Sequence, residues 1–282
     1  MNRSNSPAGL GDAVTVHDLQ NIPGLKAFIL ERQRDVELAD FIPAAALAGD
    51  WRSIAEVAAA ELEGHTGRLG VHGLFMGFAI DTYDPDVPKI VKQRLDAALD
   101  ACIVASRGRG GARMVVHSTF TTWRWYNRLT EPGRGEAIVE RVHLCLADAV
   151  KKTEDSGITI VIEYIEDKDP AERVALASSF ASPAVRVSLD TGHAHYAYGA
   201  TRAPPVDVVV RAAAGMLAHV HLQDTDAFAD RHWAIGEGSI SWHAVFEALG
   251  ELDEMPRLII ELKNARDIQP SAARLAALGL AV

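Results

Sequence analysis

Four short apolar runs decide the fold: TIVIEY at 159–164, VSLDTGH at 187–193, HVHLQD at 219–224 and LIIELKN at 258–264. Each run is typical of a buried β-strand and carries an acidic or imidazole side chain near its end. Because side chains alternate along a strand, Glu163, His221 and Glu261 are expected to face the same interior as the residues two positions before them. Buried carboxylates need a compensating partner, and a divalent cation suits a mixed set of carboxylate and imidazole groups.

Short strand patterns alternate with amphipathic helix patterns along the chain, as in α/β proteins. Strands are expected at 25–30, 35–41, 69–73, 113–118, 159–163, 185–190, 218–223 and 258–262. Helices are expected at 51–64, 88–106, 136–156, 170–180, 206–214 and 241–249. Eight such units fit a closed barrel or a doubly wound open sheet. The strand ends of a barrel converge on one rim, whereas an open sheet would spread the same polar groups along a line, so we predict a (β/α)₈ TIM barrel.

Composition places the chain among globular proteins that stay in a reducing compartment. Its 282 residues are 48% hydrophobic and 23% charged, which favours one barrel domain over 18–282 behind a loose arm over 1–17. The two cysteines, Cys102 and Cys145, form no disulfide framework. The net charge of −10 argues against nucleic acid as a partner, and no apolar run is long enough for a membrane span. A cytoplasmic protein is expected.

Further polar residues are candidates for binding a second metal ion or the substrate. His72 and His117 end two strands, and each is either a ligand or a histidine held by backbone groups. Asp230 and His232 are two residues apart, so an extended loop would present both on one side. Together with Arg231 they could grip a phosphate or a polyol, or ligate further metal.

Two of these features have a plainer interpretation that also stays open. Glu163 and Glu261 could form ion pairs with Lys263 or Arg186 inside the barrel instead of binding metal. Trp123 follows the strand that ends at 117, on the side expected to face substrate. An aromatic ring there could stack on a sugar, but a contact between two copies of the chain would use the same side chain.

The order of the site residues resembles the xylose-isomerase-like TIM barrel superfamily. The matching pattern is Glu163, then Asp190-Thr-Gly-His193, His219-Val-His221, Asp230-Arg-His232-x-x-Ile-Gly-x-Gly, and finally Glu261. This superfamily contains sugar phosphate isomerases and epimerases, inosose-type dehydratases and apurinic endonucleases, and its members are often homo-oligomers. The resemblance implies one catalytic divalent metal, Mn²⁺, Mg²⁺, Co²⁺ or Zn²⁺, bound by Glu163, Asp190, His221 and Glu261. It also implies that His193 and Arg231 contact the substrate.

The endonuclease branch of the superfamily holds three Zn²⁺ ions on the same scaffold. Its extra ligands would fall on His72, His117, His193, Asp230 and His232, and all five positions carry suitable side chains. Two segments, STFTTWRWYN at 118–127 and QDTDAF at 223–228, differ from that branch. We therefore favour a metal-dependent sugar or polyol isomerase or epimerase. In it, Glu163 and Glu261 would move a proton next to a carbonyl through a metal-stabilised enediolate. A trinuclear-zinc phosphodiesterase and a metal-dependent dehydratase or lyase are the alternatives.

Overall fold

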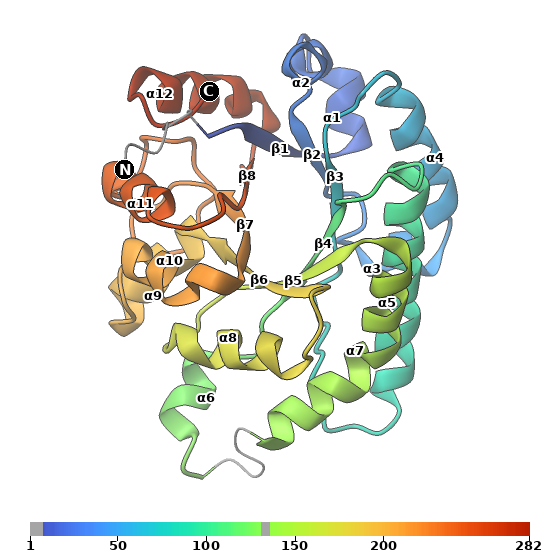
Figure 1. Ribbon diagram of the computed structural model, residues 1–282, viewed down its shortest axis with the longest axis vertical. Helices are drawn as coiled ribbons and strands as arrows, with labels where there is room; N and C mark the ends of the chain where they lie inside the picture. The colour runs from blue at the N-terminus through green and yellow to red at the C-terminus, as the bar shows by residue number, and fades with distance from the viewer. Residues whose placement is uncertain (1–7, 131–135) are drawn as a thin grey trace.

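Eight parallel strands close into a single barrel in a computed structural model that describes residues 8–130 and 136–282 (Figure 1). The strands follow one another in sequence order, and β1 pairs with both β2 and β8, which confirms the predicted (β/α)₈ barrel. The strands are β1 (Leu10–Val14), β2 (Asp35–Leu38), β3 (Leu69–His72), β4 (Arg113–His117), β5 (Thr159–Glu163), β6 (Val185–Asp190), β7 (Leu217–Leu222) and β8 (Arg257–Ile260).

Helices surround the barrel and cover the outward faces of its strands (Figure 1). They are α1 (Val16–Asn21), α2 (Leu25–Arg32), α3 (Ala44–Ala48), α4 (Trp51–Glu61), α5 (Val87–Ala105), α6 (Thr122–Asn127), α7 (Glu136–Ser156), α8 (Pro170–Ser179), α9 (Thr191–Thr201), α10 (Val206–Ala213), α11 (Trp242–Gly250) and α12 (Ile268–Ala277). The core lies between the strands and these helices, where alternate strand residues such as Ile160 and Ile162 are fully buried. Burial of this apolar layer supplies most of the stabilisation.

The first strand lies earlier in the chain than the sequence predicts. The segment at 25–30, expected as a strand, belongs to helix α2, because a short apolar run fits a buried helix as well as a strand. The loose arm predicted over 1–17 is wrong for Leu10–Val14, which form β1, while residues 1–7 lie outside the described part. Gly11 faces the barrel interior, where a Cβ would lie 2.5 Å from Ile259 Cδ1 and 2.6 Å from Asp35 Cβ. A glycine is therefore needed where β1 closes the barrel.

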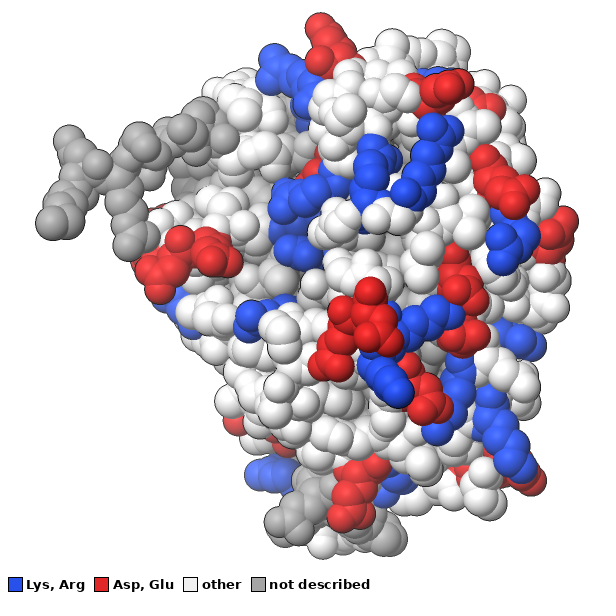
Figure 2. Space-filling view, turned by 45° about the vertical axis from the view of Figure 1, so that its right-hand side comes forward, with Lys and Arg blue, Asp and Glu red and all other residues white. Residues whose placement is uncertain are grey.

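The outer surface carries acidic and basic side chains that are interspersed on the face seen in Figure 2. Lys92 of α5 lies 3.0 Å from Asp148 of α7, and Lys152 of α7 lies 2.5 Å from Asp96 of α5. Exposed pairs of this kind contribute about 0–1 kcal/mol each, so apolar packing must hold the two helices together. None of the described helices is both long and apolar enough to cross a membrane.

Candidate metal centre

Four side chains that the sequence analysis selected as metal ligands meet at the C-terminal rim of the barrel. Glu163 ends β5, Asp190 ends β6, His221 lies near the end of β7, and Glu261 follows β8 directly. One ligand atom from each lies within 4.8 Å of the others. His221 Nδ1 is 2.5 Å from Glu163 Oε1 and 3.4 Å from Glu261 Oε2. The parallel register produces this convergence, since it sets Asp190 opposite His221.

The donor set fits a divalent cation. Asp190 Oδ2 is buried and accepts no hydrogen bond from the described residues, and Glu163 Oε2, also buried, has His117 Nε2 at 3.1 Å without the alignment of a hydrogen bond. Leaving a buried carboxylate oxygen without a partner is costly, and a bound cation would remove that cost. Carboxylate and imidazole donors without a thiolate suit Mn²⁺, Mg²⁺, Co²⁺ and Zn²⁺.

Burial and neighbouring charges shift the pKa values of two candidate ligands, His221 and Asp190, and both shifts affect metal binding. Burial alone would lower the pKa of His221, but the carboxylates of Glu261, Glu37 and Glu163 outweigh burial and hold it well above the ordinary histidine value. Burial raises the pKa of Asp190 to about 6. A metal ion must displace the proton of His221, so metal affinity is expected to fall as the pH falls.

Glu37, which was not predicted from the sequence, contacts His221 on the side away from the other candidate ligands. It is fully buried in β2, with Oε1 2.7 Å from His221 Nε2 and Oε2 3.0 Å from His219 Nε2. Because His221 Nδ1 faces Glu163, its Nε2–H can donate to Glu37, which fixes the tautomer and ring orientation. The stretch DVEL at 35–38 does carry a sequence signal for this role, because Glu37 is an acidic residue at an inward position of a strand.

Replacing Glu37 with glutamine is expected to weaken metal binding about 10–100-fold, the usual effect of removing the carboxylate behind a metal-bound histidine. Glutamine cannot supply the negative charge that makes the imidazole a stronger electron-pair donor to the metal. The dissociation constant can be measured by competition with a chromophoric chelator. Glu247→Gln, on the exposed face of α11, is the matched control. Equal affinities in the two variants would contradict the role of Glu37.

A second group of possible ligands lies beside Glu163. His117 Nε2 is 3.1 Å from Glu163 Oε2, and His72 Nε2 is 3.6 Å from the same oxygen. His72 Nδ1 lies 2.9 Å from the carbonyl oxygen of Gly73, so this ring nitrogen donates to the backbone while Nε2 faces the carboxylates. The two interpretations offered for His72 by its sequence, a backbone-held histidine and a ligand, are therefore compatible.

A third group lies above the barrel rim, in the segments that follow β6 and β7. Asp230 Oδ2 is 3.3 Å from His193 Nε2, and Asp230 Oδ1 is 3.2 Å from His232 Nε2. Burial would raise the pKa of Asp230, but hydrogen bonds from the two histidines outweigh it and hold the pKa below the usual range. The three side chains could hold a metal ion of their own.

A cavity of about 400 Å³ opens at the barrel mouth beside the centre. It is lined by Glu261, His232, Arg231 and Lys263, so a candidate carboxylate ligand and several hydrogen-bond donors face the same space. Arg231 Nη2 lies 3.1 Å from Asp226 Oδ2, and this ion pair holds the arginine at the wall of the cavity.

Two other residues considered from the sequence lie away from this cavity. Trp123 is on α6 and is 72% exposed, and it is not among the described residues that line the cavity. Its stacking role stays a prediction. Arg186 lies at the start of β6, with Nη1 3.5 Å from the carbonyl oxygen of Gly215. It is thus at the opposite end of the barrel from Glu163 and Glu261 and does not pair with them.

The chain belongs to the xylose isomerase-like TIM barrel family, whose model matches residues 35–280. The uncharacterized protein MJ1311 of Methanocaldococcus jannaschii is 29% identical over 160 residues, which cover 55% of this chain and 52% of that protein. The chain therefore matches about half the length of this curated relative.

Several solved structures have the same barrel. A D-tagatose 3-epimerase-like protein superposes with a TM-score of 0.71 at 20% identity, over 95% of this chain and 96% of that one. The TTHB071 protein from Thermus thermophilus, soaked with ZnCl₂, gives 0.67 at 21% identity over 95% and 97%. The D-allulose 3-epimerase from Methylomonas sp., in complex with D-allulose, gives 0.68 at 15% identity over 96% and 97%. At such identities the likeness shows the fold alone.

Proposed function

We propose that the protein is a divalent-metal-dependent isomerase or epimerase that acts on a sugar or polyol. The observation that carries this proposal is the pair Glu163 and Glu261, two carboxylates from separate strands that contact the same ring of His221. Two positioned carboxylates can remove a proton from carbon and return one. Similarity of the fold to proteins described as 3-epimerases supports the same reaction class.

Glu163, Asp190, His221 and Glu261 would hold the metal, which when bound supplies positive charge beside the substrate oxygens. Glu261 borders the cavity and is the carboxylate that a substrate meets first. Glu163 is fully buried and lies deeper in the barrel. One of the two takes the proton from the carbon next to the carbonyl, and the other returns a proton, from the opposite face when the product is an epimer. Arg231, His232 and Lys263 provide donors for the hydroxyl groups.

Hydrogen exchange into substrate tests this proposal directly. Metal-reconstituted protein is incubated in D₂O with D-tagatose, D-allulose and other ketoses, and NMR follows the hydrogen on the carbon next to the carbonyl. We expect deuterium to appear at that carbon with one or more ketoses, and the Glu261→Gln variant to lose the exchange. If no ketose exchanges above the rate seen with Glu261→Gln, the proposal is wrong.

A second candidate is a phosphodiesterase with three zinc ions, and the two additional ligand groups favour it. His72 and His117 share Glu163 with the main centre, and His193, Asp230 and His232 form a separate group. Three neighbouring ions could bind and activate a phosphodiester. Nicking of a duplex that contains one abasic site would support this candidate, while loss of water from a sugar in the ketose incubations would indicate a dehydratase or lyase.

A further inference from the structure

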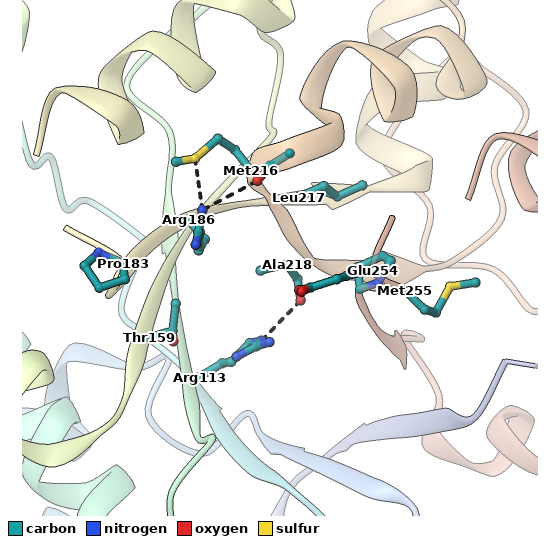
Figure 3. A pocket seen from close by; sticks show the side chains of 11 residues that line it. Arg113, Thr159, Pro183, Arg186, Met216, Leu217, Ala218, Glu254 and Met255 are labelled. Atoms are coloured by element: carbon teal, nitrogen blue, oxygen red, sulfur yellow. Dashed lines mark hydrogen bonds between the residues drawn. The ribbon is translucent and has the colours of Figure 1, made fainter. Parts of the chain in front are cut away.

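A second cavity, of about 250 Å³, lies at the N-terminal end of the barrel, the end away from the metal centre. Figure 3 shows that the side chains of Arg113, at the start of β4, and Arg186, near the start of β6, point toward it. Met216 and Met255 form part of its wall. The cavity thus combines two guanidinium groups with a mostly polar wall that includes two methionines, and the catalytic proposal uses neither arginine.

In the described part of the chain, the two guanidinium groups contact backbone and sulfur atoms rather than carboxylates. Arg113 Nε donates to the carbonyl oxygen of Ala218 at 3.2 Å, and Arg186 Nη1 lies 3.5 Å from the carbonyl oxygen of Gly215 and 3.3 Å from Met216 Sδ (Figure 3). Within residues 8–130 and 136–282, no ion pair joins either arginine to an acidic side chain. Both groups therefore keep donor capacity for a ligand.

Two acidic side chains lie near these arginines: Glu254, which lines the cavity itself, and Asp35, which already pairs with other arginines. Asp35 Oδ2 lies 2.6 Å from Arg68 Nη2 and 3.4 Å from the Nε of Arg257, which is fully buried. Burial, together with the positive charges of Arg257, Arg68 and Arg186, lowers the pKa of Arg113 to about 10. Positive charge is thus concentrated at this end of a chain whose net charge is −10. An anion in the cavity would relieve the repulsion.

We propose that this cavity binds a small phosphate-type oxyanion, with Arg113 and Arg186 as its charged ligands. The forked guanidinium group donates two parallel hydrogen bonds to phosphate oxygens, which is why arginine is common in such sites. The anion can be inorganic phosphate or the phosphoryl group of a small metabolite, whose organic part would lie against Met216 and Met255. Glu254 is exposed and lines the cavity as well, so its negative charge weakens the binding of any anion and disfavours a long polyanion such as nucleic acid most. The proposal does not depend on the reaction at the metal centre.

Titration calorimetry with inorganic phosphate, at constant ionic strength in chloride, tests the site in the full-length protein. We expect saturable binding that Arg186→Gln weakens at least tenfold. Arg52→Gln removes the same charge from the exposed surface of α4 and serves as the matched control, with affinity within twofold of wild type. Glu254→Gln removes a repulsive charge and is expected to bind phosphate more tightly.

A parallel titration with a hexose phosphate separates the two sources of the anion. Tighter binding than phosphate with the same dependence on Arg186 identifies a phosphorylated metabolite, and equal binding identifies free phosphate. If wild type binds phosphate no better than chloride, or Arg186→Gln binds it as wild type does, the proposal is overturned. Should Arg186→Gln fail to fold, Arg186→Lys keeps the charge but loses the fork. It is expected to bind at least threefold more weakly, and unchanged affinity would equally overturn the site.

Discussion

Replacing Glu163 with glutamine is expected to reduce turnover by roughly 10²–10⁴-fold, the range for loss of a general base, while the barrel stays folded. The amide has nearly the same shape as the carboxylate, but it cannot accept a proton from carbon at neutral pH. It also removes the negative charge that faces His221 Nδ1 at 2.5 Å and His117 Nε2 at 3.1 Å, so metal affinity should fall too. The rate is measured on whichever ketose shows exchange in D₂O, and circular dichroism checks the fold.

The two effects of this substitution can be separated by saturating the variant with metal. If the rate returns to that of the wild type at high metal concentration, Glu163 serves only as a ligand. If the rate stays low with the metal bound, the carboxylate also acts on the substrate. Glu247→Gln on α11 is the control for a lost surface carboxylate and should keep full activity. A rate for Glu163→Gln above a tenth of wild type would rule out the catalytic role.

Removing the metal is expected to abolish turnover, and gently purified protein is expected to contain about one divalent ion per chain. The reason is that Glu163, Asp190, His221 and Glu261 bring three carboxylates and one imidazole together, and a divalent cation would balance this excess of negative charge. Elemental mass spectrometry gives the number of ions. Activity should disappear after dialysis against a chelator and return with Mn²⁺, Mg²⁺, Co²⁺ or Zn²⁺. Full activity in metal-free protein would contradict the proposal.

The same measurement decides between the two candidate functions. About three ions per chain, dominated by zinc, would mean that the groups containing His72 and Asp230 are occupied. The Asp230→Asn variant sharpens the comparison, because it should remove one ion from a trinuclear protein and none from a mononuclear one. A trinuclear result would make the phosphodiesterase the leading function, and abasic duplex DNA would then be tested before sugars.

The rim of the barrel could be predicted because its strands are buried on both faces and their side chains alternate. In β5 the pattern predicts the bounds Thr159–Glu163, and in β6 it predicts Val185–Asp190, as the structure has them. Once the strand ends are known, convergence of Glu163 and Asp190 follows from the geometry of a parallel barrel. The fold class and the strand ends are therefore enough to predict that these two residues lie close together.

The first strand could not be predicted in this way, since LGDAV contains two residues that disfavour strands, Gly11 and Asp12. It forms because β2 and β8 provide backbone partners on either side, which is a tertiary effect. Glu37 was not predicted because it lies within its strand, behind His221, and not at a strand end, where residues of a barrel site are expected.

The position of β1 near the N-terminus also limits how far the chain can be truncated before the barrel opens. The segment that matches the family begins at residue 35, so it contains every proposed metal ligand but leaves out Leu10–Val14. A fragment with those bounds would have two unpaired parallel edges, on β2 and on β8, and would lose the contact between Ala8 and Ala281 near the C-terminus. Unpaired edges recruit strands from other molecules. A fragment expressed with boundaries taken from sequence similarity alone is thus expected to form an open sheet that aggregates, although its sequence still contains every proposed ligand.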